Sequence, residues 1–105
     1  MTSIDVSKFN TANVGDLKNF FCGCRALTSI DLSNFVVDKV KEVKNMFFNC
    51  TNLKYIDISP FEFKKIEKLE MFNNLTETGY IKIKKSLYQK VEKFIPKKWE
   101  VALIE

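Results

Sequence analysis

Three aspartates with equal spacing are the first candidates for chemistry in this 105-residue chain: Asp5, Asp31 and Asp57 lie 26 residues apart. On neighbouring parallel strands they would stack about 4.8 Å apart. Such a row could attract a cation or a basic peptide. Alternatively, each carboxylate could accept hydrogen bonds from nearby backbone and serine groups, and we favour this structural interpretation. Because equivalent carboxylates offer no distinct acid and base environments, the row does not predict acid–base catalysis.

The other reactive side chains lack the partners that catalysis requires. The chain contains no histidine, which excludes Ser–His and Cys–His pairs, and no glycine-rich phosphate-binding motif. Cys22, Cys24 and Cys50 do not have zinc-finger spacing. We interpret Cys24 and Cys50 as buried core side chains and Cys22 as an accessory thiol, since a Cys24–Cys50 disulfide needs Cα atoms within about 7 Å. We therefore predict no catalytic residue, no metal site and no cofactor, and a protein that is not an enzyme.

The aspartates belong to a segment that occurs three times. Ile4, Ile30 and Ile56 follow the same 26-residue step, and the third copy loses one residue near Glu70. Further sets with this step are Ser7, Ser33 and Ser59; Phe9, Phe35 and Phe61; Val14, Val40 and Ile66; Leu17, Val43 and Leu69; Cys24 and Cys50; and Leu27 and Leu53. A period of 20–29 residues, with a strand and a helix in each unit, is typical of leucine-rich repeats.

Each repeat carries two local patterns. Alternation around Ile30 and Leu32 predicts a short strand with one buried face, which leaves Ser29, Asp31 and Ser33 on the other face. Farther along, apolar residues recur at intervals of three and four, which predicts a helix. In the second repeat these residues are Val40, Val43, Met46, Phe47 and Cys50. The frame also predicts burial for the phenylalanines that follow each strand, Phe9, Phe35 and Phe61.

The chain is predicted to form one domain of three repeats, 1–27, 28–53 and 54–78, followed by a C-terminal cap, 79–105. The cap comprises a strand at Tyr80–Ile83, a helix at Lys84–Ile95 that Pro96 ends, and a final strand or lid at Trp99–Ile104. The predicted fold class is therefore α/β: a leucine-rich-repeat solenoid with a parallel sheet, one short strand and one helix per repeat, and a strand–helix–strand cap.

The repeated pattern TSIDLSNF…V..V..MF..C..L resembles the BspA-type leucine-rich repeats of surface proteins from bacteria and some protozoa. The resemblance covers about residues 1–75, and the tail 79–105 looks like the cap of such arrays. It implies a non-enzymatic role in adhesion or protein binding and a location at the cell surface or outside the cell. The chain shows no signal peptide, so the cytoplasm stays open as an alternative, and no apolar run approaches the ~18 residues of a membrane span.

The net charge of +4 comes from the cap. Its lysines are Lys82, Lys84, Lys85, Lys90, Lys93, Lys97 and Lys98. Such a patch could meet an anionic surface, but lysines without arginine or interleaved aromatic residues argue against nucleic acid. We interpret the patch as a solvated face.

We expect an interaction module that binds an unidentified protein through the strand-lined concave face. The predicted binding residues are Ser29, Asp31, Ser33, Tyr55, Asp57 and Ser59. The alternative is a structural, self-assembling solenoid. In that case the edge strand Ser3–Ser7, which has no cap before it, pairs with another copy to form a homo-oligomer; the first repeat could instead follow others in a longer array.

Overall fold

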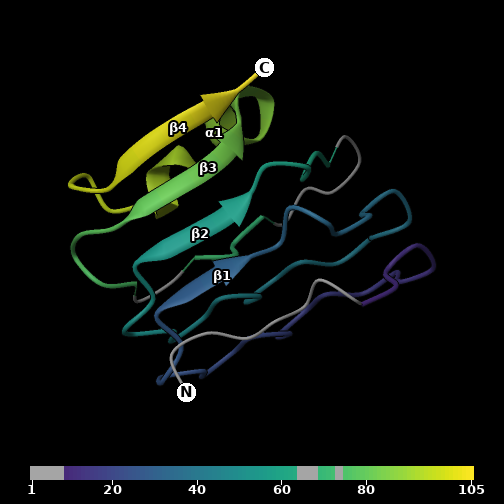
Figure 1. Cartoon of the computed structure of the whole chain (residues 1–105), viewed down its shortest axis with the longest axis horizontal. Helices are drawn as coiled ribbons and strands as arrows, with labels where there is room; N and C mark the ends of the chain where they lie inside the picture. Colours follow the sequence, from purple (N-terminus) through teal and green to yellow (C-terminus); the bar gives the residue numbers. More distant parts are fainter. Residues whose placement is uncertain (1–8, 64–68, 73–74) are drawn as a thin grey trace.

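A four-stranded parallel sheet organises the chain (Figure 1). The computed structural model describes residues 9–63, 69–72 and 75–105. The elements in chain order are β1 (Ser29–Asp31), β2 (Tyr55–Ile58), β3 (Tyr80–Lys84), α1 (Lys85–Val91), the 3-10 turn η1 (Glu92–Phe94) and β4 (Glu100–Ile104). The strands lie side by side in the order β1-β2-β3-β4. The protein is thus a small α/β fold with one short helix among the described residues.

The 26-residue step sets the register of the sheet. Ile30 pairs with Ile56, Ile56 with Ile81, and Ile81 with Val101, all in parallel register. The three isoleucines are buried, with exposed fractions of 1 % or less. The predicted neighbour relation between Ile30 and Ile56 is confirmed, whereas Ile4, Ile66 and the predicted strand Ser3–Ser7 lie outside the described residues.

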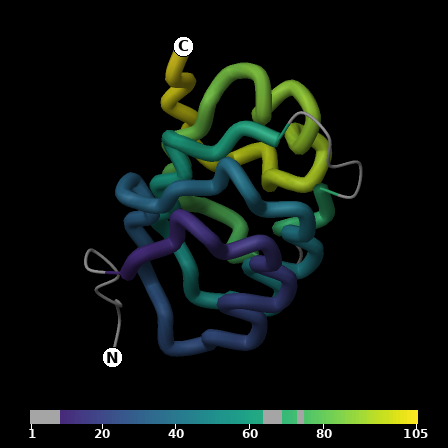
Figure 2. Tube along the Cα trace, turned by 90° about the vertical axis from the view of Figure 1, so that its right-hand side faces the viewer, coloured from purple at the N-terminus to yellow at the C-terminus, as the bar shows by residue number. Residues whose placement is uncertain are grey.

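The helix predicted at Val40–Cys50 does not form, and the equivalent part of the first repeat is not helical either. Both segments are runs of turns. One set of backbone N–H groups donates three residues back, as from Cys22 to Asn19 O, and the alternate set donates to the next repeat, as from Phe21 to Met46 O at 2.9 Å. A helix would direct every donor to the fourth preceding residue. Stacked turns instead use the neighbouring repeat, and Figure 2 shows the successive coils lying one upon another.

Left-handed residues interrupt both turn segments at equivalent positions. Asn19 and Asn45 have φ values of 61° and 60°, and Gly23 and Asn49 have values of 75° and 60°. A left-handed residue breaks an α-helix, and glycine and asparagine tolerate this conformation best. The spacing of three and four therefore reflects inward-facing residues on a series of turns, which the helical interpretation missed.

Stacked phenylalanines fill the interior of the turn segments. Phe47 lies between Phe21 and Phe72, with ring centroids 5.7 and 5.5 Å apart and interplanar angles of 8° and 1°. Nearer the sheet, Phe35 and Phe61 are buried as predicted. The prediction for Phe9 is wrong, because its side chain is 48 % exposed. Phe9 lies in the end repeat, where a neighbouring repeat covers it from one side only.

The predicted C-terminal elements are present with shifted bounds. The helix predicted at Lys84–Ile95 is divided into α1 and η1, and the last strand begins one residue after Trp99. Trp99 is buried, and its indole N–H donates to Thr76 O at 2.8 Å. Gly79 permits this packing, since a Cβ there would lie 2.5 Å from the indole ring.

Candidate functional site

The outward face of the sheet carries the polar and aromatic residues singled out from the sequence. Strand alternation places Ser29, Tyr55, Tyr80 and Glu100 in one row across the four strands, and Asp31, Asp57, Lys82 and Ala102 in the next row. The structure therefore brings together the four predicted binding residues that lie in strands. Ser33 and Ser59 follow β1 and β2 directly and complete the surface, which we call the outward face.

Two tyrosines form the centre of the outward face. Tyr55 and Tyr80 are in register, and their rings stack with centroids 5.7 Å apart and an interplanar angle of 8°. Both side chains are half-buried. Burial raises the pKa of the Tyr55 hydroxyl, and the nearby Asp57 carboxylate raises it further. The pair is thus a neutral, rigid aromatic platform, and Ser29 on the other side of Tyr55 is too short to cover its ring.

The aspartates have a structural role that the sequence suggested. Oδ1 of Asp31 accepts the N–H of Ser33 at 2.9 Å, and Oδ1 of Asp57 accepts the N–H of Ser59 at 3.0 Å. Each carboxylate therefore closes the turn that ends its strand. Hydrogen bonds from the Ser33 hydroxyl and backbone lower the pKa of Asp31. Asp5, the third predicted member of the row, lies outside the described residues.

The two aspartates differ in how they meet solvent. Asp31 is exposed, whereas Asp57 is 6 % exposed. Asp57 lies between Asp31 on one side and Lys82 on the other, so the row changes from negative to positive along the sheet. Because Asp57 is covered, Asp31 and Lys82 are the charges of this row that a partner would meet.

Tyr80 and Lys82 are site residues that reasoning from the sequence missed. They were assigned to the cap and were not aligned with the repeats, although the signal was present in the chain. The third repeat is one residue shorter, so Tyr55 is matched 25 residues later by Tyr80, and Asp57 by Lys82. A step shortened by one would have placed both on the outward face.

The cysteines lie away from the outward face and are free thiols. Cys50 is buried as predicted, Cys24 is half-buried and Cys22 is exposed. The Cys50 thiol donates to Phe21 O at 2.9 Å, and desolvation raises its pKa to about 11. Cys50 is therefore an inert core thiol. Within residues 9–63, 69–72 and 75–105, no group of three or more His, Cys, Asp or Glu side chains could hold a metal ion.

A parallel sheet built from a repeated segment, with an aromatic pair and a charged row on its outward face, defines a repeat protein with one exposed strand surface. The chain matches the family model described as "Mycoplasma protein of unknown function, DUF285" over residues 2–85, and it belongs to this family. Searches among curated proteins and among solved structures returned no match. In the described part of the chain, no helix is long and apolar enough to span a membrane.

Proposed function

We propose that this protein is a non-enzymatic interaction module, a short BspA-like leucine-rich-repeat solenoid with a C-terminal cap, which binds a protein through the outward face of its sheet. The resemblance of the repeats to BspA-type surface proteins supports an adhesive role at the cell surface. The stacking of equivalent isoleucines and phenylalanines supports a solenoid, because each repeat buries its apolar side chains against the next.

The stacked Tyr55–Tyr80 pair is the observation that carries this proposal. Tyrosine is enriched in binding sites because it offers a large contact area at a low cost in side-chain entropy. These rings are already held against each other on an exposed face. The exposed carboxylate of Asp31 beside them favours a basic or hydrogen-bond-donating group on the partner, at the end of the row away from Lys82.

A displayed random-peptide library, selected on the immobilised 105-residue chain, tests this proposal. We expect the selected peptides to bind Tyr80→Ala and Asp31→Asn at least about tenfold more weakly than the wild type, since truncated tyrosine anchors typically cost 2 kcal/mol or more. Asp31→Asn keeps an acceptor for Ser33. Lys41→Ala, at an exposed position outside the sheet, is the matched control. Equal binding to all three variants would place the interaction elsewhere.

Exposed aromatic residues in the first repeat support the alternative, self-assembly. Phe9 and Phe20 are 48 % and 45 % exposed, and Phe20 contacts Phe21 and Phe35 edge-on. A second copy packed on this end would cover them. Light scattering across a micromolar concentration series decides: a monomer throughout rejects self-assembly, whereas a dimer that Phe20→Ser dissociates supports it.

A further inference from the structure

Strand β4 is an edge of the sheet with free backbone groups. In the part of the chain that the structure describes, β4 pairs with β3 alone. The N–H of Glu100 donates to Gly79 O at 2.9 Å. Because successive residues of a parallel strand direct their hydrogen bonds to opposite sides, the N–H and C=O groups of Val101 and Leu103 point away from β3. They form a template on which another strand could pair.

The side chains of β4 do not protect this edge. Proteins usually blunt an exposed edge with lysine, proline or a bulge, but the strand reads Glu-Val-Ala-Leu-Ile. Leu103 is 47 % exposed and Ile104 36 % exposed. Leu103 continues the inward row formed by Ile58 and Ile83, which are both fully buried. An additional strand would therefore cover the one member of this row that is still exposed.

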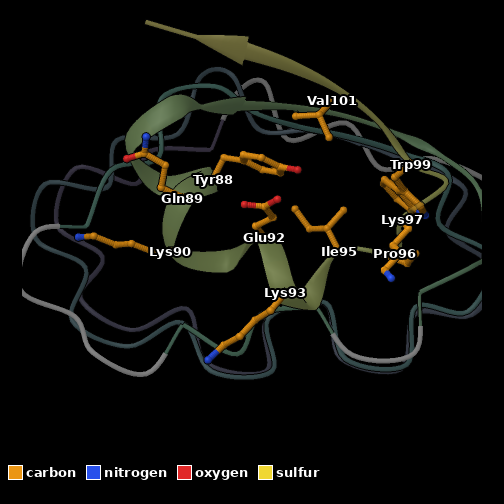
Figure 3. A pocket seen from close by; sticks show the side chains of 10 residues that line it. All are labelled: Tyr88, Gln89, Lys90, Glu92, Lys93, Ile95, Pro96, Lys97, Trp99 and Val101. Atoms are coloured by element: carbon orange, nitrogen blue, oxygen red, sulfur yellow. The ribbon is translucent and has the colours of Figure 1, made fainter.

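A groove of about 640 Å³ lies beside β4 on the inward side. Its apolar walls are Tyr88 of α1, Ile95, Pro96, Trp99 and Val101 of β4. Figure 3 shows the side chains of Tyr88, Ile95 and Val101 around the middle of this groove. The volume lies in the usual range for ligand sites, so inward-facing apolar side chains of an added strand could enter it.

The charged groups of the groove are one carboxylate and three ammonium groups. Glu92 lies among the apolar walls, while Lys90, Lys93 and Lys97 belong to the lining as well. Lys90 also donates to Phe63 O at 3.1 Å, and Lys93 lies over the Phe94 ring. Glu92 disfavours a carboxylate in the middle of the groove, so the inward positions of an added strand should be apolar.

The opposite, outward side of β4 favours acidic side chains. Ala102 is in register with Lys82, and Ile104 with Lys84. Because alanine is short, Lys82 can reach across it toward a carboxylate on the next strand, about 4.8 Å farther on. Residues 79–105 carry seven lysines and three glutamates, a net charge of +4 for this segment.

We propose that the β4 edge and its groove bind an extended acidic peptide of a partner protein by parallel strand addition. Apolar side chains of the peptide enter the groove over Val101 and Leu103. Its carboxylates alternate with them and face Lys82. This second surface is independent of the Tyr55–Tyr80 platform, and it assigns a ligand class to the lysine-rich segment.

The test uses a fluorescein-labelled peptide, Glu-Val-Glu-Val-Glu-Val-Glu, titrated with the full 105-residue chain and followed by fluorescence anisotropy. The peptide with lysine in place of glutamate should bind at least about tenfold more weakly, and raising the salt from 0.05 to 0.5 M, roughly tenfold, should weaken the acidic peptide severalfold. Lys82→Ala should reduce its affinity about threefold or more, whereas the exposed control Lys41→Ala should not.

N-methylated peptides separate strand addition from simple charge attraction without altering the protein. In the proposed register, the glutamate amides of the peptide face β4 and the valine amides face away. Methylating the glutamate amides should therefore weaken binding about fivefold or more, because hydrogen bonds are lost. Methylating the valine amides should change it little. Equal effects of the two methylations would overturn the proposal.

Amide hydrogen exchange by NMR reads the edge directly. On peptide binding, the amides of Val101 and Leu103 should become protected, while Ala102, whose amide faces β3, should change little. The absence of new protection would overturn the proposal. Protection that rises with protein concentration before any peptide is added would overturn it in favour of a second copy of this chain on β4.

Discussion

Replacing Asp57 tests whether the aspartate row stabilises the fold through its acceptor atoms or through its charge. Asp57 is 6 % exposed, and its Oδ1 accepts the half-buried Ser59 N–H at 3.0 Å. Asp57→Ala removes the acceptor and leaves this donor without its partner, which costs about 1–3 kcal/mol. Asp57→Asn keeps the acceptor oxygen and removes the negative charge that lies in register with Asp31. We expect the asparagine variant to unfold within about 0.5 kcal/mol of the wild type.

Urea unfolding followed by the fluorescence of Trp99 measures this difference, because the indole is buried and the chain contains one tryptophan. The free energy of unfolding comes from linear extrapolation, with an unchanged slope showing that the unfolded state is comparable. Thermal unfolding should agree, with a shift of about 4–8 °C for each kcal/mol. Asp31→Ala is the matched control: the same hydrogen bond to Ser33 is exposed there, so its loss should cost about 1 kcal/mol or less.

One result would refute this reasoning. If Asp57→Asn destabilised the protein as much as Asp57→Ala, the charge would matter and the acceptor would not. The natural explanation would then be attraction to Lys82, which is in register with Asp57. The row would be an ion-pair row, and the stabilising effect of Asp57 should then decrease with added salt.

Three further predictions concern the core. Phe47→Ala should lower the free energy of unfolding by about 3–5 kcal/mol, since a buried ring stacked on both sides is lost; Phe20→Ala, at a 45 % exposed position, should cost about 1 kcal/mol or less in the same urea titration. Because burial raises the pKa of Cys50 to about 11, the unfolded chain releases this proton first. Wild-type stability should therefore fall between pH ~8.5 and ~11, by at most about 3 kcal/mol, and Cys50→Ala should lack this portion of the decline in parallel pH-dependent melts. Gly79→Ala should destabilise by about 1–3 kcal/mol and perturb the emission of Trp99, because its Cβ would lie 2.5 Å from the indole; unchanged emission and stability would contradict this packing.

Much of the sheet could be predicted because parallel strands in register copy a sequence period directly into space. The 26-residue step identified Ile30 and Ile56 as neighbours, and the strand at Tyr55–Ile58 was predicted with its observed bounds. The missing residue in the third repeat even specified the place of Tyr80, although this consequence was not drawn. Asp31 and Asp57 were also correctly predicted to accept hydrogen bonds beside their serines.

By itself, then, the sequence determined which residues stack on which, since that depends only on a constant spacing. Tertiary structure decided what the spacing could not express. Apolar residues at intervals of three and four are compatible with a helix or with stacked turns, and here the neighbouring repeat accepts the N–H of Phe21 and so replaces the helical partner. Exposure was decided in the same way, because it depends on what lies beyond each repeat: Asp57 is covered between β1 and β3, whereas Phe9 and Leu103, toward the two ends of the stack, stay open to solvent.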